Sequence, residues 1–170
     1  MVAETTRIRD YEVEDASELA LLFYETVRSV NRADYSEEQV EAWAPGVPDP
    51  EGWHARMVDR RALVVEEGGE VVGFAELEDD GHLDMFYLRK DAVGRGIGRR
   101  LYQAVEREAR DLSLGRIFTE ASVTARPFFE RQGFRVLREQ TVSRRGVAMA
   151  NFAMEKPLRP FDGEGEQDVL

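Results

Sequence analysis

Three glycines stand at alternate positions beside basic residues in the run 93–100, VGRGIGRR, where they are Gly94, Gly96 and Gly98. Glycine has no Cβ, so successive backbone N–H groups can be exposed to a ligand. An apolar stretch precedes this run, and a pattern typical of an amphipathic helix follows it. The free N–H groups of a helix's first turn lie at the positive end of the helix dipole. The segment therefore predicts a loop that binds phosphate.

Two standard phosphate-binding motifs do not fit this loop. A P-loop has a lysine and then Ser or Thr after its last glycine, whereas Arg99 and Arg100 follow Gly98. The dinucleotide-binding fingerprint is G-x-G-x-x-G, and the spacing here is G-x-G-x-G. Turns also collect glycine for conformational reasons, so a purely structural loop is the alternative. Arg95 and Arg99 favour a ligand, because arginines at the start of a helix oppose its dipole unless an anion lies there.

The loop resembles the acyl-CoA-binding signature of the GNAT superfamily of N-acetyltransferases, which reads Gln or Arg, two residues, Gly, one residue, Gly or Ala. Gly96 and Gly98 match its glycine positions, and Val93 stands where the family usually has Gln or Arg. Residues 128–134, FFERQGF, are similar to the later aromatic-Glu-x-x-Gly-Phe segment of the superfamily. Two matching segments at the usual separation are more specific than one glycine loop.

Two further runs, 119–122 (TEAS) and 125–129 (ARPFF), look like the YafP-like bacterial branch of this superfamily. The resemblance extends over roughly residues 8–158. It implies a mixed α+β fold with a mostly antiparallel central sheet flanked by helices and a parallel strand pair at the acyl-CoA site. Residues 1–158 are expected to form a single domain, and the acidic, glycine-bearing stretch 159–170 a flexible tail.

The resemblance implies acetyl-CoA as co-substrate, bound in two ways. In the superfamily, the strand before the loop pairs through its backbone with the pantetheine arm, and the loop amides bind the pyrophosphate. Phe86 and Leu88 would face a core in any such strand, so a structural role for their side chains remains open. Carried over by position, the cofactor-binding residues are Phe86, Tyr87, Leu88, Val93, Gly94, Arg95, Gly96, Gly98, Arg99, Ser122 and Phe129.

Acyl transfer from a thioester to an amine requires a base for the amine and a proton donor for the leaving thiolate. Ionisable side chains on the strands near the loop are the candidate bases. Among these we expect Asp84 and Glu120 to be catalytic, because the strand of Asp84 should border the acyl group and that of Glu120 should diverge from it. A water molecule can relay the proton to either. The full set of candidate bases is Glu76, His82, Asp84 and Glu120.

Phe129 stands where GNAT enzymes commonly have a tyrosine near the thioester sulfur. Phenylalanine cannot donate a proton, so we expect Ser122 to take part in catalysis; Tyr87, Tyr102, a water molecule or unassisted departure of the thiolate are the alternatives. The resemblance implies an N-acetyltransferase that moves an acetyl group to a primary amine of a small molecule or protein by direct attack in a ternary complex. The missing tyrosine leaves a second hypothesis, a non-catalytic acyl-CoA-binding module.

The composition argues against several other classes of protein. The 170-residue chain has no cysteine and only two histidines, which excludes a thiolate zinc site and predicts no metal. A formal net charge of −11 argues against nucleic acid as a partner. No apolar run reaches the ~18 residues needed to span a bilayer, so we expect a cytoplasmic protein without membrane contact. Strands near the C-terminal hairpin often form dimers in this superfamily, which makes a homodimer one expectation.

Periodicity and turn signals predict the elements that would hold these residues. Apolar residues recur with a period near 3.6 in residues 16–30 and 97–112, which predicts two amphipathic helices. A helix between two strands favours a parallel pairing, here between 117–123 and an earlier strand. Shorter helices are expected at residues 36–43, 53–58 and 125–132. Strands are expected at residues 5–10, 62–66, 71–77, 82–88, 117–123, 134–142 and 147–154.

Overall fold

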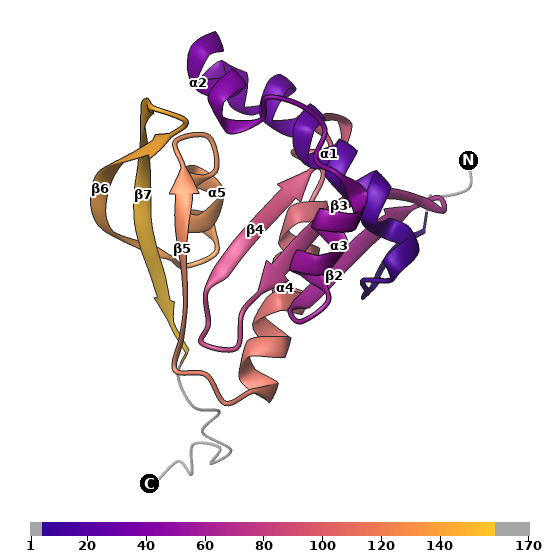
Figure 1. Cartoon of the computed structure of the whole chain (residues 1–170). Helices are drawn as coiled ribbons and strands as arrows, with labels where there is room; N and C mark the ends of the chain where they lie inside the picture. The colour runs from indigo at the N-terminus through magenta and orange to yellow at the C-terminus, as the bar shows by residue number, and fades with distance from the viewer. Residues whose placement is uncertain (1–4, 159–170) are drawn as a thin grey trace, which may run out of the picture.

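The computed structural model of the chain describes residues 5–158, so the stretch 159–170 that is expected to be a flexible tail lies outside the described residues. Two antiparallel sheets lie beside each other with helices around them (Figure 1). The first sheet has the order β1-β2-β3-β4, with strands Thr6–Asp10, Arg61–Glu67, Glu70–Leu77 and Leu83–Leu88. The second has the order β5-β7-β6, with strands Arg116–Ser122, Val147–Pro157 and Arg135–Arg144. The α+β class and the mostly antiparallel pairing are confirmed.

Helices cover both faces of the first sheet. α1 (Ala16–Ser29) and α3 (Pro50–Met57) pack on one face, and α4 (Ile97–Asp111) packs on the other (Figure 1). α2 (Glu37–Trp43) and α5 (Arg126–Arg131) lie against the second sheet. Short 3-10 turns occupy Val13–Asp15, Asn31–Ala33 and Lys90–Ala92. Within the described part of the chain, no helix is long and apolar enough to cross a membrane.

The predicted elements are all present, and the largest shift in a helix boundary occurs in α3. The sequence pattern predicts a start at Trp53, whereas the helix begins at Pro50. The carboxylate of Asp49 accepts a hydrogen bond of 3.1 Å from the backbone N–H of Gly52, which caps the first turn. Proline at the first helical position is favourable because it has no N–H to leave unsatisfied.

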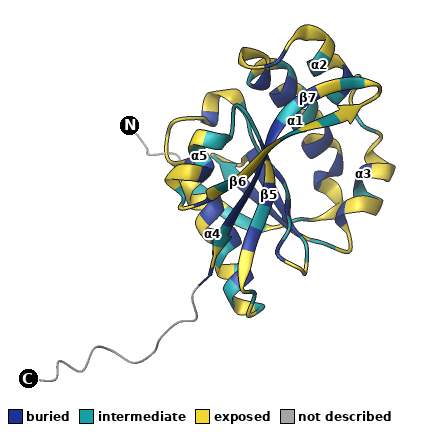
Figure 2. Cartoon of the chain, turned by 90° about the vertical axis from the view of Figure 1, so that its left-hand side faces the viewer, coloured by how far each residue is buried: buried dark blue, intermediate teal, exposed yellow. Residues whose placement is uncertain are grey.

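Apolar stripes on the helices hold the layers together. On α4, Ile97, Leu101 and Val105 recur at helical spacing and are no more than 3% exposed. On the other face of the sheet, Leu19 of α1 packs in a cluster with Phe74 of β3. Figure 2 shows that buried residues lie on the strands and on the inner faces of the helices. Burial of this periodic apolar surface is what holds α1 and α4 in place.

β4 and β5 touch only near their first residues. One parallel bridge joins His82 to Phe118, whereas β5 pairs with β7 along its whole length. The hydroxyl of Thr119 also donates a 2.7 Å hydrogen bond to the carbonyl oxygen of Leu83. The predicted parallel pair is thus limited to a single bridge, whereas the full ladder of β5 is with β7. Beyond this point β4 and β5 are each an outer strand of their own sheet.

The chain after α1 joins the two sheets at the far ends of these strands. The hydroxyl of Tyr35 donates to the carbonyl oxygen of Ala150 (2.6 Å) and accepts from the N–H of Val123 (2.9 Å). The amide of Asn31 donates to Oγ of Ser122 at 3.3 Å. Because α1 packs on the first sheet, these bonds link the two sheets through α1 and the turn after it, on the far side of the region in which β4 and β5 separate.

Candidate active site

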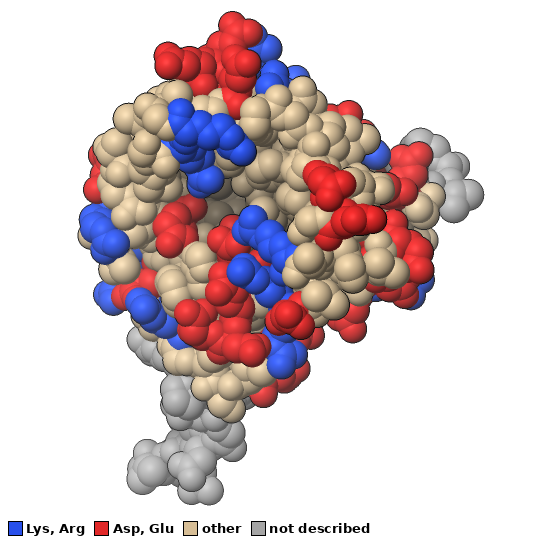
Figure 3. All heavy atoms as spheres, in the orientation of Figure 1, with Lys and Arg blue, Asp and Glu red and all other residues tan. Residues whose placement is uncertain are grey.

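A cleft of about 850 Å³ lies between β4 and β5 and extends to the glycine loop. The space-filling view in Figure 3 shows a hollow near the middle of the face turned toward the viewer, with basic and acidic side chains around it. Among the predicted site residues, Arg95 does not line the cleft. Those that do are Asp84, Phe86, Tyr87, Leu88, Val93, Gly94, Gly96, Gly98, Arg99, Glu120, Ser122 and Phe129.

The three glycines of the loop serve different structural needs. Gly94 and Gly96 have φ angles of +79° and +84°, a left-handed conformation that favours glycine. A Cβ atom at either position would have no neighbour within 4 Å, so the space above their backbone is open to a ligand. Gly98 instead allows close packing, because a Cβ there would lie 3.0 Å from Cδ1 of Leu88 and 3.1 Å from Cε2 of Phe128. Gly96 is also the N-cap of α4, which directs the free N–H groups of its first turn toward this space.

The arginines around the loop point to different partners. Arg99 lines the cleft. Both terminal nitrogens of Arg95 donate 2.8 Å hydrogen bonds to the carboxylate of Glu67, which ties the loop to the end of β2. A terminal nitrogen of Arg100 lies 3.4 Å from the carbonyl oxygen of Thr6. Positive charge within the cleft at this helix start therefore comes from Arg99.

Backbone groups of β4 face the cleft. The N–H of Arg89 donates to the carbonyl oxygen of Val72 on β3 (2.7 Å), and backbone groups alternate in direction along a strand. Phe86 and Leu88 therefore direct their N–H and C=O groups away from β3 and into the cleft. The hydroxyl of Thr26 on α1 donates a 3.0 Å hydrogen bond to the carbonyl oxygen of Leu88. A strand edge of this kind can pair with an extended ligand.

Ser122 ends β5 with its hydroxyl in the cleft wall. Its Oγ accepts hydrogen bonds from the amide of Asn31 at 3.3 Å and from the N–H of Ala125 at 3.0 Å. A hydroxyl has two acceptor lone pairs and one O–H. Because both lone pairs are used, the O–H is left as a donor, and no acceptor for it is found within residues 5–158.

Phe129 is a core residue with 3% exposure. Its ring centroid lies 5.7 Å from that of Phe86, 5.3 Å from that of Phe128 and 5.1 Å from that of Phe134. The rings of Phe86, Phe128 and Phe129 contribute an apolar wall to the cleft. The ring of Phe129 contributes shape and apolar surface at a position where no proton can be donated.

Two tyrosines line the same cleft and were alternatives to Ser122 as proton donors. Burial raises the pKa of Tyr87 to about 12. The hydroxyl of Tyr102 donates to Glu106 at 3.1 Å, and burial also raises its pKa. Both phenols therefore remain protonated at neutral pH, but the hydrogen atom of Tyr102 already has an acceptor.

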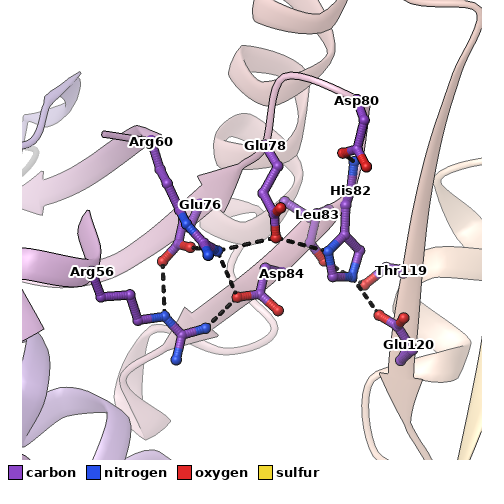
Figure 4. A network of polar contacts seen from close by, with 10 residues as sticks. All are labelled: Arg56, Arg60, Glu76, Glu78, Asp80, His82, Leu83, Asp84, Thr119 and Glu120. Carbon is purple, nitrogen blue, oxygen red and sulfur yellow. Dashed lines mark hydrogen bonds and ion pairs between the residues drawn. The ribbon is translucent and has the colours of Figure 1, made fainter. Parts of the chain in front are cut away.

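A network of charged side chains lies behind the cleft wall (Figure 4). Asp84 on β4 accepts hydrogen bonds from Arg56 and from Nη1 of Arg60, the latter at 3.1 Å. Glu76 on β3 has a fully buried side chain and also accepts from Arg60. Burial raises the pKa of Glu76, although the two arginines oppose this shift. The carboxylate of Asp84 is therefore fixed by two guanidinium groups at the edge of the cleft.

The network continues to β5 through a histidine. Nδ1 of His82 lies 2.9 Å from the carboxylate of Glu78, and Nε2 lies 2.6 Å from the carboxylate of Glu120 (Figure 4). The hydrogen bond to Glu120 raises the pKa of His82 to about 9, while burial opposes it and Glu78 adds to it. The same bond lowers the pKa of Glu120. Glu78, His82 and Asp84 have potential ligand atoms within 4.8 Å of one another, but Arg60 holds both carboxylates, so we assign no metal to them.

The sequence predicts Asp84 and Glu120 as bases, and both line the cleft, as does a third carboxylate, that of Glu106; His82 was also a candidate base. It did not reveal that His82 contacts Glu120. It also missed Thr26 and Asn31, which reach the cleft from the end of α1 and the turn after it. For Thr26 a signal was present, since it lies on the apolar face of a predicted helix, where a hydroxyl needs a partner.

Comparisons with known proteins agree with this geometry. Residues 31–156 match the family described as Acetyltransferase (GNAT) domain. The uncharacterized N-acetyltransferase YafP of Escherichia coli strain K12 is 29% identical over 148 residues, which cover 87% of this chain and 93% of YafP. The crystal structure of a GCN5-related N-acetyltransferase (Aminotransferase, Class-II) from Rhodopseudomonas palustris is 37% identical, with a TM-score of 0.86, and the match covers 93% of this chain and 99% of that one.

A more distant structure shares the fold. The PaiA N-acetyltransferase of Thermoplasma acidophilum, solved in complex with coenzyme A, is 20% identical with a TM-score of 0.72, and the match covers 91% of this chain and 99% of that one. The family match extends over well more than half of the chain. The chain therefore belongs to the GNAT acetyltransferase family, in its YafP-like branch, and is an acyltransferase.

Proposed function

We propose that this protein is an acetyl-CoA-dependent N-acetyltransferase that moves the acetyl group to a primary amine of a small molecule or protein. One observation carries the proposal: a single cleft joins two unpaired strand edges to a helix N-terminus with open glycine positions. Acetyl-CoA needs both features, because its arm contains amides and its other end carries a pyrophosphate.

The residues of the cleft fit acetyl-CoA as a co-substrate. Backbone groups of Phe86 and Leu88 would pair with the arm, and the N–H groups of residues 94–99 would hold the pyrophosphate. Arg99 would add a charge-assisted contact to it. The aromatic wall that includes Phe129 would pack against the arm. The open space above Gly94 and Gly96 is the feature of this chain that supports such a cradle.

The other end of the cleft suits the acceptor amine. We assign the base to Glu120, because its side chain lines the cleft and is 45% exposed, so it can take a proton directly or through water. Asp84 also lines the cleft, and it would contribute negative charge beside the amine while Arg56 and Arg60 hold it. Ser122 would donate its O–H to the sulfur of the leaving thiolate.

The available nucleophiles favour direct attack of the amine over an acyl-enzyme intermediate. The chain contains no cysteine. Within residues 5–158, no base contacts the hydroxyl of Ser122: Asn31 and Ala125 donate to Oγ, while the imidazole of His82 contacts Glu120 instead. We therefore propose a ternary complex in which the amine nitrogen bonds to the thioester carbon and the C–S bond then breaks.

A screen of primary amines, with release of free CoA thiol as the readout, tests this function. We expect acetyl-CoA to raise the melting temperature and at least one class of amine to release CoA. Gly96→Trp is the blocked control, because it fills the open space and imposes a side chain on a φ of +84°. Failure of acetyl-CoA to bind the folded wild type in calorimetry would overturn the proposal. Binding without CoA release across the whole panel would favour a non-catalytic acyl-CoA-binding module.

A further inference from the structure

One imidazole lies between two carboxylates where β4 and β5 meet. His82 contacts Glu120 through Nε2 at 2.6 Å and Glu78 through Nδ1 at 2.9 Å. Glu120 lines the cleft, whereas His82 does not. A hydrogen-bonded path therefore runs from the cleft through Glu120 to His82 and ends at Glu78, whose carboxylate also accepts from Arg60 at 3.0 Å.

The surroundings of His82 favour the doubly protonated ring. A neutral imidazole has one N–H, so one ring nitrogen would direct a lone pair at a carboxylate. The imidazolium instead donates to both carboxylates. Asp80 accepts the backbone N–H of His82 at 3.0 Å, and the ring stacks on Phe118 with centroids 5.0 Å apart. The other charged groups near this ring are Glu78 and Arg60 on one side, Asp84 on β4, and Glu120 and Arg116 on β5.

We propose that His82, acting through Glu120, is the proton acceptor for the amine in the acetyl transfer of the proposed function. His82 does not touch the amine and is thus a positioning residue, while Glu120 makes the contact. The inference rests on the proposed function for the identity of the reaction. The pairing of His82 with Glu120 is a property of the folded protein and can be measured without turnover.

The acceptor ammonium ion loses its proton to His82 in two transfers. An N–H bond of the incoming ammonium breaks and an O–H bond forms on Glu120, which passes its proton across the 2.6 Å contact to Nε2 of the neutral imidazole. The product is the carboxylate–imidazolium pair. The neutral amine then attacks the thioester carbon, the C–S bond breaks, and the sulfur leaves with the electron pair. Ser122 gives its O–H proton to the sulfur to form CoA thiol and takes the second amine proton in its place. The imidazolium returns its proton to solvent through Glu120, which is 45% exposed.

The pKa of the His82–Glu120 pair is closer to that of an alkylammonium ion than the pKa of a lone carboxylate is. An alkylammonium such as that of lysine has a pKa of ~10.4. A lone glutamate carboxyl group has an ordinary pKa of ~4.3, so transfer to such a group is uphill by roughly 6 pKa units. The pKa of His82 is about 9. Once the ring is neutral, transfer to the pair is therefore uphill by only about 1 to 2 units, and each unit is a factor of about ten. Below pH 9 the ring must first lose its own proton to solvent through Glu120.

Two amines of the same shape separate this role from a structural one. The variant is His82→Gln, which keeps a side-chain donor but cannot take up a proton. With an alkylamine identified by the screen, we expect kcat to fall about 100-fold. With its β,β,β-trifluorinated analogue, which is mostly neutral at pH 7, the loss should be less than about threefold, because that amine reaches the cleft already deprotonated. A purely structural role for His82 would lower both rates equally, and that result would overturn the proposal.

His54→Gln is the matched control, because His54 is the only other histidine, lies on α3 and contacts Tyr11 at 3.0 Å. We expect it to leave both rates unchanged. With the alkylamine, log kcat of the wild type should rise with pH up to about 9 and then level, following deprotonation of His82. His82→Gln should lose this rise.

Imidazole titration by NMR decides the pairing even if no amine is turned over. The chain has two histidines, so the signal missing from His82→Gln is assigned at once. In the wild type we expect that signal to titrate near pH 9 and to shift downward in Glu120→Gln. Titration near ~6.5, the ordinary value, would overturn the proposal whether or not the protein is active. Absence of CoA release from an otherwise intact enzyme would instead count against the proposed function.

Discussion

Thr119 and Leu83 join the two sheets where β4 and β5 begin to separate, through a 2.7 Å hydrogen bond from the threonine hydroxyl to the leucine carbonyl oxygen. The threonine is 7% exposed, so this bond is made away from water. A buried hydrogen bond of this kind contributes to stability mainly because its partner would otherwise remain unsatisfied. It also fixes the narrow end of the cleft.

The variant Thr119→Val should destabilise the protein by about 1–3 kcal/mol, because the Leu83 carbonyl loses its donor while the side-chain volume hardly changes. Urea unfolding measures this difference. Thr124→Val is the matched control, because the hydroxyl of Thr124 is buried without a hydrogen-bond partner among the described residues. We expect that variant to be neutral or slightly stabilising. Equal destabilisation by the two changes would show that the Thr119 bond contributes nothing specific.

Arg99→Ala should weaken CoA binding about tenfold, or ~1.4 kcal/mol, because it removes the arginine that lines the cleft beside the glycine loop. Calorimetry at fixed ionic strength measures the Kd. Arg95→Ala serves for comparison, since it breaks the pair of 2.8 Å bonds to Glu67 outside the cleft lining. A change of less than about threefold is expected for that variant. The assignment of the pyrophosphate contact to Arg99 fails if Arg95→Ala weakens binding more.

Local signals explain why the elements could be predicted. Ser36 followed by Gln39 is a capping-box pattern, and the structure contains both capping hydrogen bonds, at 2.9 and 3.1 Å. The apolar period of 97–112 predicts α4 for a similar reason, since each contributing residue lies within a few turns of the next. Glycines and a helix start adjacent in sequence likewise made the loop predictable.

The contacts of the site are not local, and single-sequence patterns could not predict them. His82 and Glu120 lie 38 positions apart, and they meet only because a parallel bridge brings Phe118 beside β4. Arg95 illustrates the same limit. Its position in the loop favoured an anion, yet its guanidinium reaches Glu67, 28 positions earlier in the chain.

Stability in acid should depend on Asp15. Burial raises the pKa of this carboxyl group. Hydrogen bonds from Arg9 at 2.7 and 2.8 Å and from the N–H of Glu12 lower it by more, so the net pKa lies below the ordinary value. A lowered pKa in the folded state contributes stability above the unfolded value of ~3.9. That contribution is lost as the pH falls through the folded-state pKa.

Asp15→Asn should therefore cost about 2 kcal/mol at pH 6 and progressively less toward pH 2. The free energy of unfolding in urea, measured across this range, checks the prediction. Asp34→Asn replaces an exposed carboxylate and should change stability little at any of these pH values. A difference between the wild type and Asp15→Asn that stays constant from pH 6 to pH 2 would contradict the linkage.

Variants of Ser122 and Asn31 separate the proposed proton donor, the Ser122 hydroxyl, from the Asn31 amide that holds it in place. Ser122→Ala removes the O–H, and we expect kcat to fall about 100-fold, with little change in the KM for acetyl-CoA, because the donor would act on charge that develops at the sulfur. Asn31→Ala removes only the 3.3 Å bond to the same oxygen and should lower kcat less than about threefold. Asn31→Ala deletes one hydrogen bond to Oγ and should reduce stability by ~1 kcal/mol, whereas Ser122→Ala deletes two and should reduce it by ~2 kcal/mol. If kcat falls in both variants in proportion to their loss of stability, Ser122 has a structural role and not a catalytic one.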